Sequence, residues 1–171
     1  MPTPVPGTYP GYFQNYISLV RAASVHEAIK MYSSTLDEFF TEINETKSTF
    51  RYAENKWSIK EVLQHITDAE RIFAFRVLSL ARGEQTPLPG FDENEYAVNS
   101  RADNRSWKSI LDEFLANRKS TDLLLQSFDE SQLQSSGTTN GKRNTVIAIS
   151  FVIIGHALHH LNVVKERYLH S

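Results

Sequence analysis

Four long segments with a helical spacing of apolar residues constrain the fold of this 171-residue chain. They begin near residues 24, 58, 106 and 145, and they extend to about residues 43, 82, 128 and 168. Apolar side chains recur every three or four positions within them, which places these side chains on one face of a helix. No convincing strand-like alternation lies between them. The pattern predicts an all-α protein, a four-helix bundle that can place ligands in its core.

Capping signals support the starts of the first two segments. Ser24 is followed by Glu27, and Ser58 is followed by Glu61, so each pair has the spacing of a capping box. Gly83 directly follows the second segment and is a natural stop for a helix. The length suits one domain that covers residues 1–171, and no internal repeat is visible.

A long connection, residues 83–105, joins the second predicted helix to the third. Its first half contains two prolines and two glycines, which argue against a helix there. A loop of this length in a compact domain is usually functional, often as a lid over a site. The simpler interpretation, which we favour and which is compatible with a lid, is an overhand link between helices that are not adjacent. Residues 135–144, SSGTTNGKRN, are a second stretch dense in turn residues.

Composition excludes several functional classes. The net charge of −2 and the absence of a basic stripe argue against nucleic-acid binding. The chain has no cysteine, which excludes disulfides, cysteine-bound zinc and a protein thiol nucleophile. The N-terminal residues have neither the basic nor the apolar region of a signal peptide. We therefore expect a cytoplasmic protein.

The longest apolar stretch, residues 146–158, is interrupted by Ser150, Gly155 and His156. It is too short to span a bilayer and is typical of a buried core helix, so no membrane partner is expected. The fourth predicted helix is apolar around much of its circumference. This suits either a central position in the bundle or the interface of a homodimer.

Three histidines lie close together in the fourth predicted helix: His156, His159 and His160. Imidazole is the side chain that most often binds transition metals in proteins. His156 and His160 are four residues apart, so they lie on one face about 6 Å apart along the axis. This spacing favours the pair as ligands and His159 as a flanking residue. Convergence of His156 with His159 stays open at this point.

His65, on or beside the apolar face of the second predicted helix, is the candidate third ligand. Taken alone it would be interpreted as a hydrogen-bonded core residue. Burial of the histidine pair without a shared partner would be costly, so a metal explains the joint pattern better. Three protein ligands with an open position are typical of catalytic metal sites. The chain contains no HExxH and no Glu-x-x-His, which argues against a zincin protease and a di-iron carboxylate bundle.

Two charged residues near His65 have two interpretations each. Asp68 could orient an imidazole or act as a general base, and Arg76 could clamp a substrate carboxylate. We favour the simpler interpretations, in which Asp68 is a surface carboxylate near Arg71 and Arg76 is a snorkelling surface arginine.

Residues 57–96 and 155–169 together resemble the DinB/YfiT-like family of metalloenzymes, which is distinct from the DNA polymerase that shares the DinB name. The resemblance extends over nearly the whole chain. Its motifs are Trp57 before the second helix, His65 within it, the PLPGFDE segment at 87–93, and GHxxHHLN from Gly155.

The resemblance implies a four-helix bundle, often dimeric, in which His65, His156 and His160 hold a divalent metal. Zn or Ni is favoured over Fe or Mn, although three imidazoles also suit Cu. Related enzymes include S-transferases and isomerases that use thiols such as bacillithiol or mycothiol. We therefore expect a metal-dependent S-transferase with a small-molecule substrate and a low-molecular-weight thiol. The alternatives are a metal-dependent hydrolase and a non-catalytic, stress-related metal-binding module.

Overall fold

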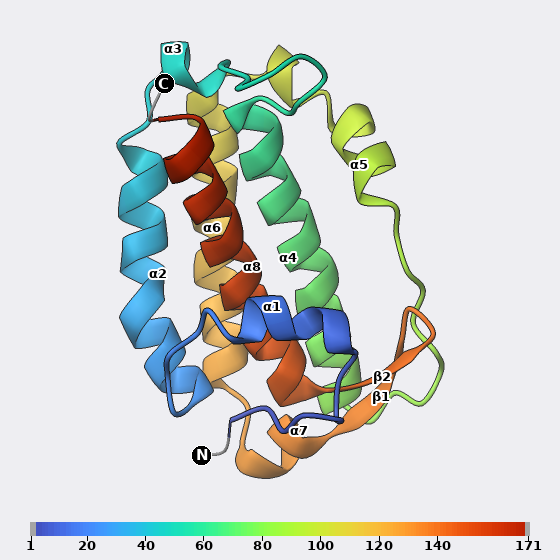
Figure 1. Ribbon diagram of the computed structural model, residues 1–171. Helices are drawn as coiled ribbons and strands as arrows, with labels where there is room; N and C mark the ends of the chain where they lie inside the picture. Colours follow the sequence, from blue (N-terminus) through green and yellow to red (C-terminus); the bar gives the residue numbers. More distant parts are fainter. Residues whose placement is uncertain (1–2, 170–171) are drawn as a thin grey trace.

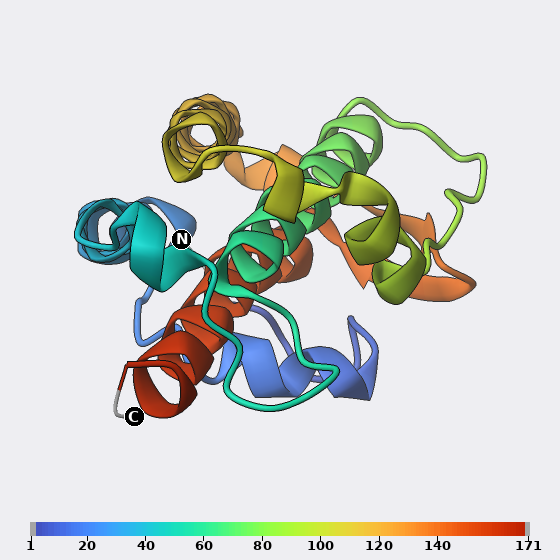
Figure 2. The same cartoon turned by 90° about the horizontal axis from the view of Figure 1, so that it is seen from above.

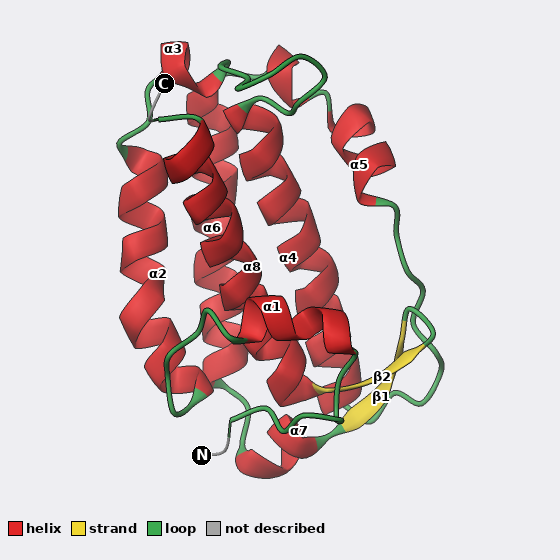
Figure 3. Cartoon of the chain, in the orientation of Figure 1, coloured by secondary structure: helices red, strands yellow, loops and turns green. Residues whose placement is uncertain are grey.

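A computed structural model describes residues 3–169 of the chain. Its four long helices are α2 (Val25–Thr41), α4 (Ile59–Ala81), α6 (Trp107–Gln126) and α8 (Val146–Arg167). They form a bundle (Figures 1 and 3), so the predicted all-α four-helix fold is confirmed.

The directions of these helices set the topology of the bundle. In Figure 1, α2 and α8 run upward, whereas α4 and α6 run downward. Helix α4 packs against both α6 and α8, and α2 packs against the same two helices (Figure 2). The link after α4 therefore leads back to the start of that helix and joins two parallel neighbours. The expectation that it joins non-adjacent helices was wrong, because connection length does not determine which helices pack together.

Shorter elements connect the bundle helices. They are η1 (Gly11–Phe13), α1 (Gln14–Ile17), α3 (Glu45–Ser48), α5 (Glu93–Ser100), η2 (Ala102–Asn104), α7 (Glu130–Gln134), β1 (Ser136–Thr139) and β2 (Lys142–Thr145). The first half of the long connection is non-helical, as predicted, whereas α5 and η2 occupy its second half.

The two strands form an antiparallel hairpin that the sequence did not predict. Its turn is Asn140–Gly141, and both residues have positive φ angles, 49° and 68°. An Asn-Gly pair at such a turn is the strongest short-range signal of a hairpin. Strands of four residues are too short to show a clear alternation, which explains why the stretch resembled a simple turn.

The capping signals have the expected effect. The Ser58 hydroxyl accepts from the backbone N–H of Glu61, and the Glu61 carboxylate accepts from the N–H of Ser58, which completes a capping box. At the start of α2, the Ser24 hydroxyl accepts from Glu27 N–H, but the Glu27 carboxylate accepts from Ala23 N–H instead. Both helices thus begin where their caps predict.

Helix α8 is the core helix of the bundle. It is long and apolar enough to cross a membrane by length and composition, but 78% of its apolar window is buried inside the protein. Such burial is typical of the core helix of a soluble protein and agrees with the interpretation of residues 146–158.

The N-terminal segment packs across α8, where α1 lies in front of that helix in Figure 1. Gly155 makes this approach possible. A Cβ atom at this position would lie 2.2 Å from the carbonyl oxygen of Tyr16. The backbone of α1 therefore contacts α8 one residue before His156.

Candidate metal centre

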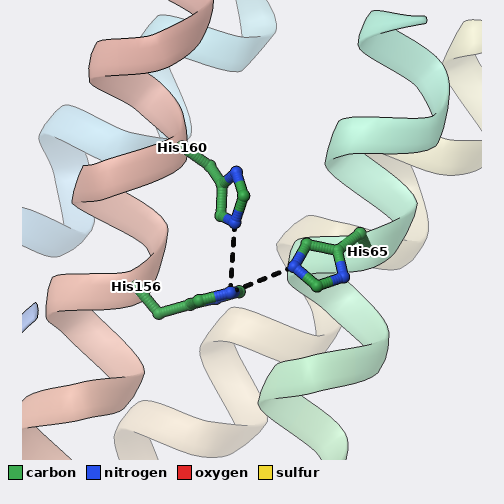
Figure 4. A group of neighbouring side chains, drawn as sticks. All are labelled: His65, His156 and His160. Carbon is green, nitrogen blue, oxygen red and sulfur yellow. Dashed lines mark hydrogen bonds between the residues drawn. The ribbon is translucent and has the colours of Figure 1, made fainter. Parts of the chain in front are cut away.

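Helices α4 and α8 bring His65, His156 and His160 together (Figure 4). His65 lies in the first third of α4, and the other two lie on successive turns of α8. The Nε2 atom of His156 is 3.1 Å from Nε2 of His65 and 3.1 Å from Nε2 of His160. One ligand atom from each residue lies within 4.8 Å of the others. The sequence therefore predicted the three residues that converge.

Hydrogen bonding alone does not account for this arrangement. A neutral imidazole nitrogen carries either one N–H or one lone pair, so His156 Nε2 can form a full hydrogen bond with only one of its two neighbours. Two imidazole nitrogens that bind one tetrahedral zinc at about 2.0–2.1 Å lie roughly 3.3 Å apart. The observed separations of 3.1 Å and the all-imidazole donor set fit a divalent metal.

Burial keeps these histidines neutral. It lowers the pKa of His65 to about 4, and the nearby His159 adds to the shift. The pKa values of His156 and His160 are held well below the ordinary value, first by burial and then by neighbouring histidines. A metal binds the neutral imidazole, so the cluster is in its binding form at neutral pH.

Aromatic rings surround the cluster. The Trp57 ring lies 4.9 Å from the His65 ring, measured between centroids, and the Tyr16 ring lies 5.4 Å from that of His156. Trp57 directly precedes the N-cap of α4, whereas Tyr16 comes from the N-terminal segment that crosses α8. Spacing along the sequence gave no signal for Tyr16, because only the tertiary crossing brings it here.

Two cavities adjoin the histidines. The first, of about 280 Å³, is lined by His65, His156, the N-terminal segment, Phe91, Glu93 and the hairpin turn, among others. The second, of about 370 Å³, is lined by His160, His159, Trp57 and Arg167, among others. We name them the first and second cavity. The cluster therefore lies between two separate spaces, each of a size that suits a small molecule.

His159 does not belong to the cluster. It is exposed, it lines the second cavity, and its ring lies 5.0 Å from that of His160. The structure thus separates it from the converging pair, in agreement with the interpretation of His159 as a flanking residue.

Asp68 also lies outside both cavities. Its Oδ1 accepts from Gln64 Nε2 at 3.0 Å and lies 3.6 Å from Arg71 Nη1. The position beside Arg71 agrees with the simpler interpretation, whereas the carboxylate is partly buried rather than fully at the surface.

Arg76 differs from its expected position. It is only 4% exposed, it lines the first cavity, and its Nη2 donates to the carbonyl oxygen of Pro89 at 2.8 Å. The interpretation as a snorkelling surface residue was therefore wrong. The physical reason is that residues of the long connection cover this face of α4.

Contacts with the hairpin hold that connection in place. Leu88 N–H donates to Thr138 O, and Asn140 N–H donates to Leu88 O, both at 2.9 Å. A Cβ atom on Gly90 would lie 2.2 Å from Asn140 Oδ1, so the glycine allows the two segments to touch. The PLPGF segment and the hairpin turn together form one wall of the first cavity.

Comparison with known proteins agrees with this architecture. The family model of the DinB superfamily matches residues 30–164. The chain belongs to the DinB superfamily. The match contains all three converging histidines and begins after the N-terminal segment that lines the first cavity.

Individual proteins resemble part or nearly all of the chain. A protein of Oceanobacillus iheyensis named "Putative metal-dependent hydrolase" is 28% identical over 83 residues, which cover 46% of this chain. The match spans 47% of that relative, about half its length.

Solved structures show the same fold. YfiT from Bacillus subtilis, described as "a probable metal-dependent hydrolase with an unusual four-helix bundle topology", has a TM-score of 0.72 and 15% identity. That match covers 98% of this chain and 92% of YfiT. A mycothiol-dependent maleylpyruvate isomerase has a TM-score of 0.61 and 12% identity, over 85% of this chain and 59% of that one. The histidine cluster and these relatives together indicate a divalent metal.

Proposed function

We propose that this protein is a metal-dependent S-transferase whose divalent ion is held by His65, His156 and His160. The thiol of a low-molecular-weight cosubstrate would attack a small electrophile at this site, and the ion would supply the activation of that thiol. The observation that carries the proposal is the position of three neutral imidazole nitrogens between two cavities. Two spaces beside one reactive position suit a reaction of two small molecules.

The side chains around the site have defined tasks in this proposal. The three imidazoles would hold the ion, and a site with three protein ligands keeps a position for a further ligand. When bound, the ion lowers the pKa of a thiol at that position. The thiol sulfur forms the new bond to an electrophilic carbon, the leaving group departs with its electron pair, and the thiol proton passes to solvent. Because the chain has no cysteine, the sulfur nucleophile arrives with the cosubstrate.

Hydrolysis is the second candidate, and the names of the Oceanobacillus relative and of YfiT favour it. The same three ligands could activate water in place of a thiol. Turnover of esters or amides without added thiol would select hydrolysis, whereas strict dependence on thiol would select transfer. A comparison of both substrate panels on one metal-loaded preparation decides between them.

Metal content tests the site itself. Elemental analysis of wild type, His65→Ala and His160→Ala should show close to one divalent ion per chain in wild type and loss in both variants. His159→Ala is the matched control, because it removes an adjacent histidine outside the cluster. Equal metal content in wild type and the two cluster variants would contradict the assignment.

A purely structural metal site predicts different behaviour. Metal removal would lower the melting temperature in either case, but at a purely structural site added thiols would leave the spectrum of a cobalt-substituted protein unchanged. We also expect a homodimer, which sedimentation equilibrium would test directly.

A further inference from the structure

Arg76 lies on the same face of α4 as His65. Eleven residues separate them, which is close to three helical turns and about 16 Å along the axis. Ala69 and Phe73 lie between them, and all four residues line the first cavity. Helical side chains lean toward the N-terminus of their helix, so the Arg76 side chain leans in the direction of His65. The cavity thus has imidazoles at one end and a guanidinium toward the other.

The charge of Arg76 has no acidic partner among residues 3–169. Its one hydrogen bond goes to the Pro89 carbonyl oxygen, and its Nε atom is buried without a partner. The guanidinium carbon lies 5.6 Å from the centre of the Phe73 ring. Burial lowers the pKa of Arg76, and the Tyr12 phenol shifts it in the opposite direction. A buried cation without a carboxylate is costly, which indicates a site that an anion completes.

The rest of the cavity limits what that anion can be. Phe13, Ala69, Phe73 and Phe91 supply apolar surface, and a volume of about 280 Å³ admits only a small molecule. Within the described chain, Arg76 is the only arginine or lysine that lines this cavity, and Glu93, which is exposed, is the only carboxylate. One guanidinium balances the single negative charge of a carboxylate, whereas a phosphate monoester carries about −1.5 to −2 charges at neutral pH.

We propose that Arg76 binds the carboxylate of a small ligand and thereby directs the other end of that ligand toward the three histidines. The ligand is a short aliphatic carboxylate, and it is either the thiol cosubstrate or the electrophile. The position of its reacting end rests on the proposed function, whereas the carboxylate contact does not.

The first experiment tests the carboxylate contact without metal. Hexanoate and 1-hexanol are titrated into metal-free protein by calorimetry. We expect wild type to prefer hexanoate by about tenfold or more, Arg76→Lys to keep part of the preference, and Arg76→Met to lose it. Arg82→Met, which removes an exposed arginine just after the same helix, should behave as wild type. Circular dichroism of each variant verifies folding.

The second experiment uses cobalt-loaded protein with 6-mercaptohexanoate and 6-mercaptohexanol, followed by the thiolate-to-cobalt absorption band. Saturation at lower concentration with the mercaptocarboxylate in wild type, but not in Arg76→Met, would support a thiol cosubstrate as the source of the carboxylate. Equal affinity of both thiols, with a hexanoate preference in the first experiment, would assign the carboxylate to the electrophile.

Two outcomes separate the hypotheses. No preference for hexanoate in wild type, or the same preference in Arg76→Met, overturns the role of Arg76. Absence of the absorption band with either thiol counts against the proposed function alone, because the first experiment does not require a metal.

Discussion

Two arginines are buried in this bundle, and carboxylates surround only one of them. Arg118 on α6 is 1% exposed, and its Nη1 and Nη2 atoms lie 2.7 Å from Glu70 and 2.9 Å from Asp122. Arg76 on α4 is buried almost as deeply, but it faces a cavity and has no such partner among the described residues. The first arginine joins packed helices, whereas the second leaves its charge available to a ligand.

Shared features of the two residues make the comparison sharper. Both have an Nε atom that is buried without a hydrogen-bond partner. Orphaned donors therefore do not distinguish a binding residue from a structural one in this protein. The distinction comes from the carboxylates around Arg118 and from the cavity beside Arg76. These surroundings determine how much stability each substitution should remove.

The largest expected effect is on stability at Arg118. Arg118→Met leaves Glu70 and Asp122 buried without their cation and should reduce the free energy of unfolding by about 3–5 kcal/mol. Arg76→Met removes a cation that has no carboxylate, so its cost should be about 1 kcal/mol or less. Urea denaturation of metal-free protein at pH 7 measures both. Equal losses would abolish the distinction between the two arginines.

The buried histidines provide a pH test of the cluster. The pKa of His65 in the folded chain is about 4, below its ordinary value of 6.5, so the unfolded chain binds more protons between these values. Stability is therefore complete above pH 6.5 and falls as pH drops toward 4, by roughly 3 kcal/mol for His65 alone. Denaturation of metal-free protein at several pH values should show this slope. It should be weaker in His65→Gln than in wild type.

Metal binding should stabilise the protein independently of Arg118. A ligand that binds only the folded state adds about 2.7 kcal/mol at a concentration of 100 times Kd. We expect this gain with Zn²⁺ in wild type and in Arg118→Met, and its loss in His160→Ala. Thermal melts with and without Zn²⁺ measure it. If Zn²⁺ stabilised His160→Ala as much as wild type, the ion would bind elsewhere.

The smallest expected effect is at Gly90, beside the residue that accepts from Arg76. Gly90→Ala brings a Cβ atom against the Asn140 side chain, which can move, so the stability loss should be about 1 kcal/mol. The shift should still displace Pro89 and weaken the preference for hexanoate. Gly141→Ala is a useful comparison, since it strains the same hairpin turn with no neighbour within 4 Å of the added atom.

The sequence predicted the parts of this molecule that depend on local periodicity. Helix α8 and its histidine pair follow from a spacing of four, and His65 follows from the apolar face of α4. Arg76 was misplaced because its burial depends on the PLPGF segment, which is held by hairpin contacts distant in sequence. No local sequence pattern around Arg76 predicts that the PLPGF segment packs over it. The crossing of α1 over α8 was missed for the same reason.

That crossing has a practical consequence for work with shortened chains. A chain that begins at Ser24 would retain Arg76 and all three histidines, and it would still contain the whole region that matches the DinB superfamily. It would lose Tyr12, Phe13 and Tyr16, which line the first cavity. Tyr16 lies near His156 because Gly155 leaves room for its backbone. The residues that such a fragment loses also include four buried side chains of the core, Tyr9, Phe13, Ile17 and Val20. The region that matches the family model is therefore not a complete core, and metal and substrate measurements should use the whole chain.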